Sequence, residues 1–151
     1  MRFHQIKEIY QHIKDVNREF ETFCQQLLKK TKDERLRMFI HYLIDKQDGN
    51  NDYLDTLIKS ESHKVTDSWV DEDIEHGLAK KFIEYKQQTI LSIDEILAIN
   101  IEIIETINDW LLLIVDLSTN QTVKEHILDL IERQSQQSHK LVHSAHRMDD
   151  M

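Results

Sequence analysis

The stretch Leu43-Ile44-Asp45-Lys46-Gln47-Asp48-Gly49-Asn50 occurs twice in this chain in nearly the same form. Its second copy is Leu130-Ile131-Glu132-Arg133-Gln134-Ser135-Gln136-Gln137, which repeats the order Leu, Ile, acid, base, Gln, two variable residues and an amide. The second copy begins 87 residues after the first, and a leucine follows each copy at the same distance, Leu54 in one and Leu141 in the other. This pattern predicts one helical hairpin present in two copies.

The duplication extends beyond these two octets when the same offset is kept without gaps. Matching pairs are Glu8 with Glu95, Ile9 with Ile96, Phe20 with Ile107, Phe23 with Trp110, Leu27 with Ile114, Leu36 with Val123 and Ile40 with Ile127. The turns also correspond, because Thr31 matches Ser118 and Asp33 matches Asn120. Any two amphipathic hairpins of equal length would match at apolar positions, whereas the shared octet and turn residues favour a duplication.

The composition predicts an all-α protein. The 151 residues suit a single domain over 1–151, proline is absent, and glycine occurs only at positions 49 and 77. Leu, Ile, Glu, Lys and Gln are plentiful, and these residues favour long uninterrupted helices. Apolar residues recur at helical spacing nearly throughout. We expect long helices at about 2–30, 33–60, 90–118 and 121–147.

The connection between the second and third predicted helices is long. Residues 62–90 are less regular, and a short amphipathic helix is expected around Ile74, Leu78, Phe82 and Tyr85. Simple up-down-up-down bundles need only short connections. About 28 residues can instead travel the roughly 40 Å height of a bundle with helices of about 27 residues. The prediction is a four-helix bundle of two antiparallel hairpins joined by one crossover.

Charge and hydropathy restrict the partners. The formal net charge of −9 argues against a nucleic-acid-binding surface, which needs clustered Lys and Arg. No stretch approaches the roughly 20 apolar residues of a membrane span, and the amino terminus lacks the apolar region of a signal peptide. Cys24 is the only cysteine, so no intramolecular disulfide is expected. We expect a cytoplasmic protein without nucleic-acid or membrane partners.

The chain resembles the ferritin-like superfamily, and within it most nearly the rubrerythrin-type proteins. The resemblance is carried by the hairpin duplication, by the frame Leu-x-x-x-polar-x-x-polar-x-x-x-Leu, and by aromatic Phe23 and Trp110 near the ends of the first and third helices. It implies a ferritin-like four-helix bundle. In that family, the second and fourth helices each carry Glu-x-x-His in this frame, and the first and third each add a Glu. Together these ligands hold two iron or manganese ions.

Amides replace the family's ligands in this chain. The frame places Gln47 and Asn50 on the second helix, and Gln134 and Gln137 on the fourth, where Glu and His would stand. Asn100 is the polar residue on the inward stripe of the third helix, whereas Asp15 and Glu102 are expected to point away from the core. Each amide offers only a weak neutral oxygen ligand. We therefore expect no metal cofactor, and a core cluster in which the amides satisfy one another.

Two alternatives remain open at this point. A shifted frame recovers Asp48 on the second helix and His139 on the fourth, and with Glu102 and His143 these could form a di-iron or di-manganese site of an oxidoreductase or iron-handling protein. His139 and His143 are also spaced by four residues, as two ligands on one helix face would be. The second alternative is a small-ligand carrier that uses the vacated cavity.

The sequence does not indicate an enzyme, because two glycines provide no phosphate-binding loop and no nucleophile signature is present. The expectation is a non-catalytic structural or interaction protein. The family resemblance implies a homodimer, while a protein partner is not identified.

Overall fold

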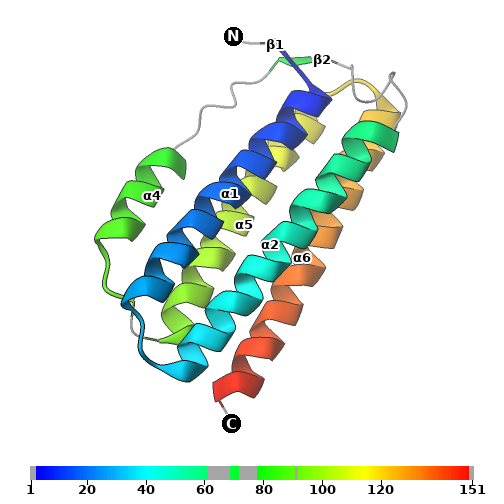
Figure 1. Ribbon diagram of the computed structural model, residues 1–151. Helices are drawn as coiled ribbons and strands as arrows, with labels where there is room; N and C mark the ends of the chain where they lie inside the picture. The colour runs from blue at the N-terminus through cyan, green and yellow to red at the C-terminus, as the bar shows by residue number, and fades with distance from the viewer. Residues whose placement is uncertain (1–2, 61–68, 72–77, 91, 150–151) are drawn as a thin grey trace.

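The computed structural model describes residues 3–60, 69–71, 78–90 and 92–149 (Figure 1). The helices are α1 (Ile6–Lys30), α2 (Glu34–Ser60), α4 (Leu78–Gln87), α5 (Ile93–Leu117) and α6 (Gln121–Asp149). Two short strands, β1 (Phe3–Gln5) and β2 (Trp69–Asp71), pair antiparallel, with His4 opposite Val70. The all-α class is confirmed.

The first helix begins later than the sequence predicted. Residues 3–5 form β1, and α1 starts only at Ile6 because Gln5 serves as its N-cap. The backbone N–H of Gln5 donates to the Glu8 carboxylate at 2.9 Å, which satisfies a donor at the start of the helix. The short helix expected in the crossover is α4; Ile74, the first residue proposed for it, lies outside the described residues.

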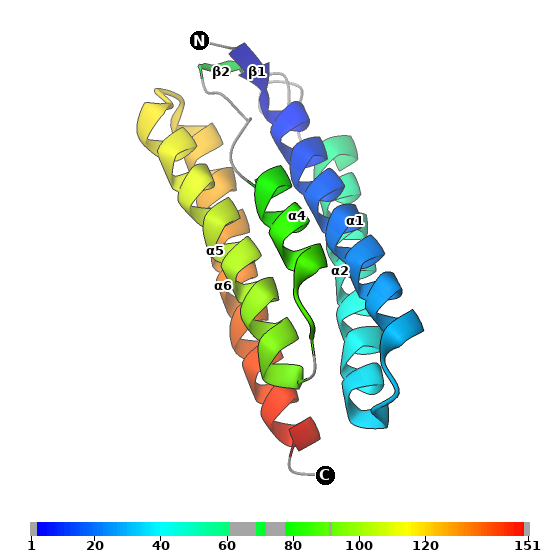
Figure 2. The same cartoon turned by 90° about the vertical axis from the view of Figure 1, so that its left-hand side faces the viewer.

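The long helices pack in pairs. α1 lies along α2 and runs in the opposite direction, and α5 and α6 form a second pair of the same kind (Figure 1). α2 and α5 run in the same direction, so the chain between them returns along the length of the helices. α4 lies on this return path and packs against both α1 and α5 (Figure 2).

The offset of 87 residues recurs in the helix boundaries. α1 and α5 each have 25 residues, beginning at Ile6 and Ile93. The turns also end in the same way, because the Asp33 carboxylate accepts the backbone N–H of Arg35 at 2.9 Å and the Asn120 side chain accepts that of Thr122 at 2.9 Å. Both are N-terminal helix caps. The turns before α2 and α6 therefore make the same capping hydrogen bonds.

The core runs between the helix pairs and is mostly aliphatic. Its fully buried side chains come from all four long helices. The largest lie on α1, α2 and α5 and are Tyr10, Phe20, Phe39, Ile6, Ile9, Ile13, Ile40, Leu43, Leu54, Ile96, Leu111 and Ile114, while α6 adds Val123, Ile127 and Ala145. Burial of such side chains is the main source of stability, at about 1.5–3 kcal/mol for each. A few polar residues interrupt this core, and they define the candidate site.

Candidate functional site

The amides predicted from the repeated octet meet where α2 faces α6. Gln47 and Asn50 of α2 line a cavity of about 20 Å³ together with Gln137 of α6. A second cavity of about 10 Å³ is lined by Asn50, Gln134 and Gln137. Each space is close to the roughly 10–15 Å³ that one water molecule requires. The two copies of the octet therefore bring their polar positions together around water-sized spaces.

The hydrogen bonds of these amides do not join the two octets. Asn50 Nδ2 donates to Gln47 Oε1 at 3.4 Å within α2, and Gln134 Nε2 donates to Asn108 Oδ1 of α5 at 2.5 Å. Among the described residues, no hydrogen bond joins an α2 amide of this set to an α6 amide. The expected mutual network therefore amounts to one direct bond, and the gap between the helices is wide enough for bridging water.

Other side chains connect α2 to α6 directly. The Arg133 guanidinium lies 3.7 Å from the centre of the Tyr53 ring, and Ser144 Oγ donates to the Tyr42 hydroxyl at 3.1 Å. A cation over an aromatic face contributes about 0.5–1 kcal/mol at an exposed site. These contacts flank the amides on both sides along the helices, so they hold the two octets in register.

Asn100 is the most deeply buried of the predicted amides. It is 1 % exposed, and neither its Nδ2 nor its Oδ1 has a hydrogen-bond partner among the described residues. It lies one helical turn before Ile104, which lines the larger of the two amide cavities. A buried amide left without partners costs about 1–3 kcal/mol. The structure thus places a polar group in the core that the surrounding packing does not satisfy.

The residues of the alternative metal site lie apart. Asp48 is beside Glu21 of α1, and Glu102 accepts a hydrogen bond from Lys81 Nζ of α4 at 2.9 Å. The pKa of Glu102 is lowered by this lysine. His139 and His143 are exposed on α6. Within the described residues, no three His, Cys, Asp or Glu side chains are close enough to share a metal ion.

A ladder of polar pairs crosses from α1 to α2 and was missed in the sequence. Lys14, only 5 % exposed, forms an ion pair with Asp55, and Asn17 Nδ2 donates to Asn51 Oδ1 at 2.9 Å. Glu21 and Asp48 are the third pair. We call these six residues the polar seam.

The duplication contains the signal that would have revealed the polar seam. At the offset of 87 residues, Lys14 and Asp55 correspond to Ile101 and Val142, and Asn17 corresponds to Ile104. A position that is polar in one hairpin and aliphatic in the other is not required by the hairpin itself. Lys14, Asn17 and Asp55 are such positions, whereas the other three seam residues correspond to polar Asn108, Ser135 and Ser138.

The charges of the polar seam shift the titration of its carboxyl groups. The ammonium of Lys14 lowers the pKa of Asp55. Burial, together with the neighbouring Asp48 carboxyl, raises the pKa of Glu21 to about 7. Burial also raises the pKa of the nearby Cys24 thiol, so this cysteine is neutral at physiological pH.

The raised pKa of Glu21 makes stability depend on pH. The folded state holds the Glu21 proton more tightly than the unfolded chain, in which the carboxyl has its ordinary pKa of 4.5. The contribution of this protonated carboxyl to stability is therefore complete below pH 4.5 and is lost as pH rises through about 7. Glu21→Gln is therefore expected to be more stable than the parent protein at about pH 8 and closer to it at about pH 5. Urea denaturation at both pH values measures this difference.

Glu19→Gln is the matched control, because Glu19 is exposed on the same helix. It should leave the pH dependence of the urea midpoint unchanged. If Glu21→Gln and Glu19→Gln behaved alike, the proton shared between Glu21 and Asp48 would have no influence on folding.

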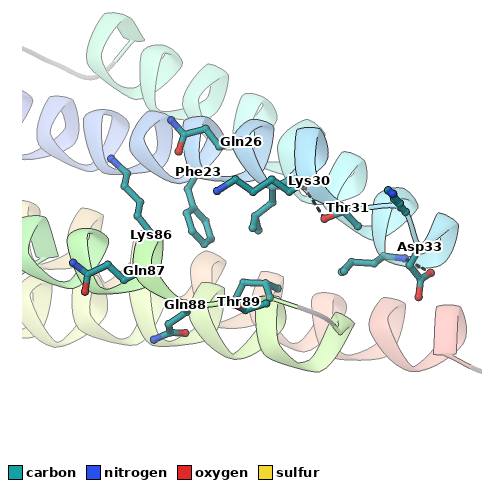
Figure 3. A pocket seen from close by; sticks show the side chains of 13 residues that line it. Phe23, Gln26, Lys30, Thr31, Asp33, Lys86, Gln87, Gln88 and Thr89 are labelled. Carbon is teal, nitrogen blue, oxygen red and sulfur yellow. Dashed lines mark hydrogen bonds between the residues drawn. The ribbon is translucent and has the colours of Figure 1, made fainter.

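A larger cavity than those between the amides lies at the end of the molecule where α1 turns into α2. It has a volume of about 450 Å³ and is bounded by the ends of α1 and α4, the start of α2 and residues 88–90 (Figure 3). The sequence offered no motif for this cavity, because it is assembled from two connections that are distant in the chain.

Comparison with known proteins provides no assignment for this site. The chain matched no protein-family model, no curated protein and no solved structure. None of the described helices is both long and apolar enough to cross a membrane. The function therefore has to be inferred from the chain's own geometry.

Proposed function

We propose that this chain is a ferritin-like four-helix bundle in which amides occupy the positions of the di-metal ligands, and that it acts as a non-catalytic structural or interaction protein. One observation carries the proposal. Gln47 and Asn50 from the first octet face Gln134 and Gln137 from the second around two adjoining cavities. In ferritin-like proteins the Glu-x-x-His positions of the second and fourth helices face one another in this way. Here the same positions carry amides instead of metal ligands.

The path of the chain supports the ferritin-like assignment. α2 and α5 run in the same direction, and the connection between them spans the molecule and includes α4. A single long crossover distinguishes ferritin-like bundles from up-down-up-down bundles. The equal lengths of α1 and α5 and the matching N-caps of α2 and α6 agree with an origin from one duplicated hairpin.

The chemistry of the cluster supports a non-catalytic role. Two divalent metal ions bring about four positive charges into a low-dielectric interior, and carboxylates normally offset them. In this chain the core positions that correspond to the metal ligands hold neutral amides. The Asp48 carboxyl instead contacts Glu21, and the Glu102 carboxylate accepts a hydrogen bond from Lys81. Buried polar residues of this kind can fix the register of packed helices, and we assign that role to the amides.

The remaining parts of the proposal come from the sequence. We propose a homodimer, as the family resemblance implies, a cytoplasmic location, as the composition indicates, and no cofactor, because amides replace the metal ligands. The competing functions are a di-iron or di-manganese oxidoreductase and a carrier of a small ligand between the amides. The water-sized spaces of about 20 and 10 Å³ favour the structural role over the carrier.

Metal analysis tests the proposal directly. Protein purified without a histidine tag, then incubated with ferrous iron or manganese and desalted, is expected to retain far less than one ion per chain by mass spectrometry. Stoichiometric metal that is lost in Asp48→Asn, Glu102→Gln or His139→Ala would establish the oxidoreductase alternative instead. Sedimentation velocity on the same sample measures whether the chain dimerises.

A further inference from the structure

We propose that the 450 Å³ cavity at the α1–α2 turn binds a small organic anion with an apolar body, of the medium-chain carboxylate class. Its volume falls within the roughly 300–1,000 Å³ of small-molecule sites. The inference goes beyond the proposed function and does not depend on the amide cluster, because none of the cluster's residues lines this cavity.

The floor of the cavity is apolar. It is formed by Phe23, Leu27, Leu36 and Ile90, each at most 9 % exposed. The Phe23 side chain points from α1 toward the segment that joins α4 to α5 (Figure 3). These side chains come from three separate parts of the chain and are already packed, so the floor is formed before any ligand arrives. A hydrocarbon body placed on it would leave water without disturbing the core.

The rim of the cavity is cationic, although the chain as a whole has a net charge of −9. Lys30 of α1, Lys32 of the turn and Lys86 of α4 all line it, and none of the three makes an ion pair with a described residue. Asp33 is the single carboxylate among the lining residues, and it accepts the backbone N–H groups of Arg35 and Leu36. The rim thus carries three ammonium groups and one carboxylate, and that carboxylate already accepts two backbone hydrogen bonds.

The second hairpin shows that the turn does not require these lysines. At the offset of 87 residues, Lys30 and Lys32 correspond to Leu117 and Thr119. α5 ends at Leu117 without any basic residue in its last turn, and its C-cap Ser118 makes the same backbone bond as Thr31. The turn of the second hairpin therefore forms without lysines, and the proposed anionic ligand accounts for the lysines that surround the cavity.

The floor and the rim together specify the ligand. An inorganic anion would make no use of the apolar floor, and an apolar molecule would leave the lysines without a counter-charge. A cation would be repelled by Lys30 and Lys86, which approach the cavity from α1 and α4 (Figure 3). An apolar body with one anionic group uses both features.

Three probes of equal chain length separate these contributions: octanoate, octan-1-ol and octylammonium. Each is titrated, below its micellar concentration, into uniformly ¹⁵N-labelled protein, and amide shifts are followed by NMR. Octanoate is expected to shift the amides of Phe23, Thr31 and Thr89 and to bind about tenfold more tightly than octan-1-ol, with octylammonium weakest. Equal affinity for all three probes, or shifts confined to other regions, would overturn the proposal.

Variants locate the charge and the volume separately. Lys30→Gln combined with Lys86→Gln should remove the preference for octanoate over octan-1-ol, whereas Lys29→Gln, a neighbouring exposed lysine that does not line the cavity, should retain it. Gln26→Trp adds bulk at the exposed rim without altering the floor, and it should weaken binding of octanoate and octan-1-ol together. Octanoate binding that survives both the double substitution and Gln26→Trp would place its site elsewhere and reject the assignment.

Discussion

Asn100→Leu is expected to raise the free energy of unfolding by about 1–3 kcal/mol, since it removes a buried amide that no described residue satisfies. Leucine has the same branched side-chain skeleton as asparagine, so the change replaces polar atoms with methyl groups at nearly constant shape. Urea denaturation measures the effect as a higher midpoint at unchanged slope. Few single substitutions in a core are expected to be stabilising.

The duplication supplies a reciprocal control at Ile13, which occupies the equivalent position of α1 and is 0 % exposed. Ile13→Asn buries an amide where the fold already accepts an aliphatic side chain, and it should lower the free energy of unfolding by about 2–5 kcal/mol. Destabilisation by Asn100→Leu as well would mean that the Asn100 amide contributes to stability. The account of that residue as an unsatisfied group would then be wrong.

If the proposed ferritin-like arrangement is correct, introducing the ligands of that family should create a metal site. The fourfold variant Gln47→Glu, Asn50→His, Gln134→Glu and Gln137→His places two carboxylates and two imidazoles around the existing cavities. Without metal it should be less stable than the parent protein, because moving a carboxylate out of water costs more than burying a neutral amide. Manganese or cobalt should restore stability, by about 2.7 kcal/mol when free metal is 100 times the dissociation constant.

Thermal or urea unfolding with and without metal measures this linkage, and cobalt adds a visible absorption band that reports ligand geometry. The parent protein should show no metal-dependent shift. A half-site variant with only Gln47→Glu and Asn50→His should show a smaller shift than the fourfold variant. If the fourfold and half-site variants responded equally, the α2 and α6 positions would not act on one ion, and the convergence of the two octets would have no chemical meaning.

Much of the helix pattern could be predicted because it depends on local sequence. Absent proline and helical apolar spacing predict the long helices, and Asp33 and Asn120 mark their starts as N-caps. The start of α1 was predicted too early, since the strand at residues 3–5 pairs with residues 69–71. That contact is between distant parts of the chain and leaves no periodicity in either segment.

The candidate site was predictable only in part, because it also depends on contacts between distant parts of the chain. Gln47 and Gln134 could be located because a repeated frame fixes their place on each helix. Their hydrogen-bond partners could not, since Asn108 comes from outside the frame. The 450 Å³ cavity at the α1–α2 turn depends on how α4 packs against α1. That packing is determined by contacts between helices and not by any local motif.

The polar seam also solves a problem that the duplication creates. Two hairpins of nearly equal design could exchange helices, with α1 pairing with α6, within one molecule or between two. In that exchanged pairing Lys14 would meet Val142 in place of Asp55, and a buried ammonium group would lose its counter-ion. Leaving such a charge unpaired is strongly unfavourable. The polar seam therefore favours the pairing of α1 with α2 over the pairing of α1 with α6.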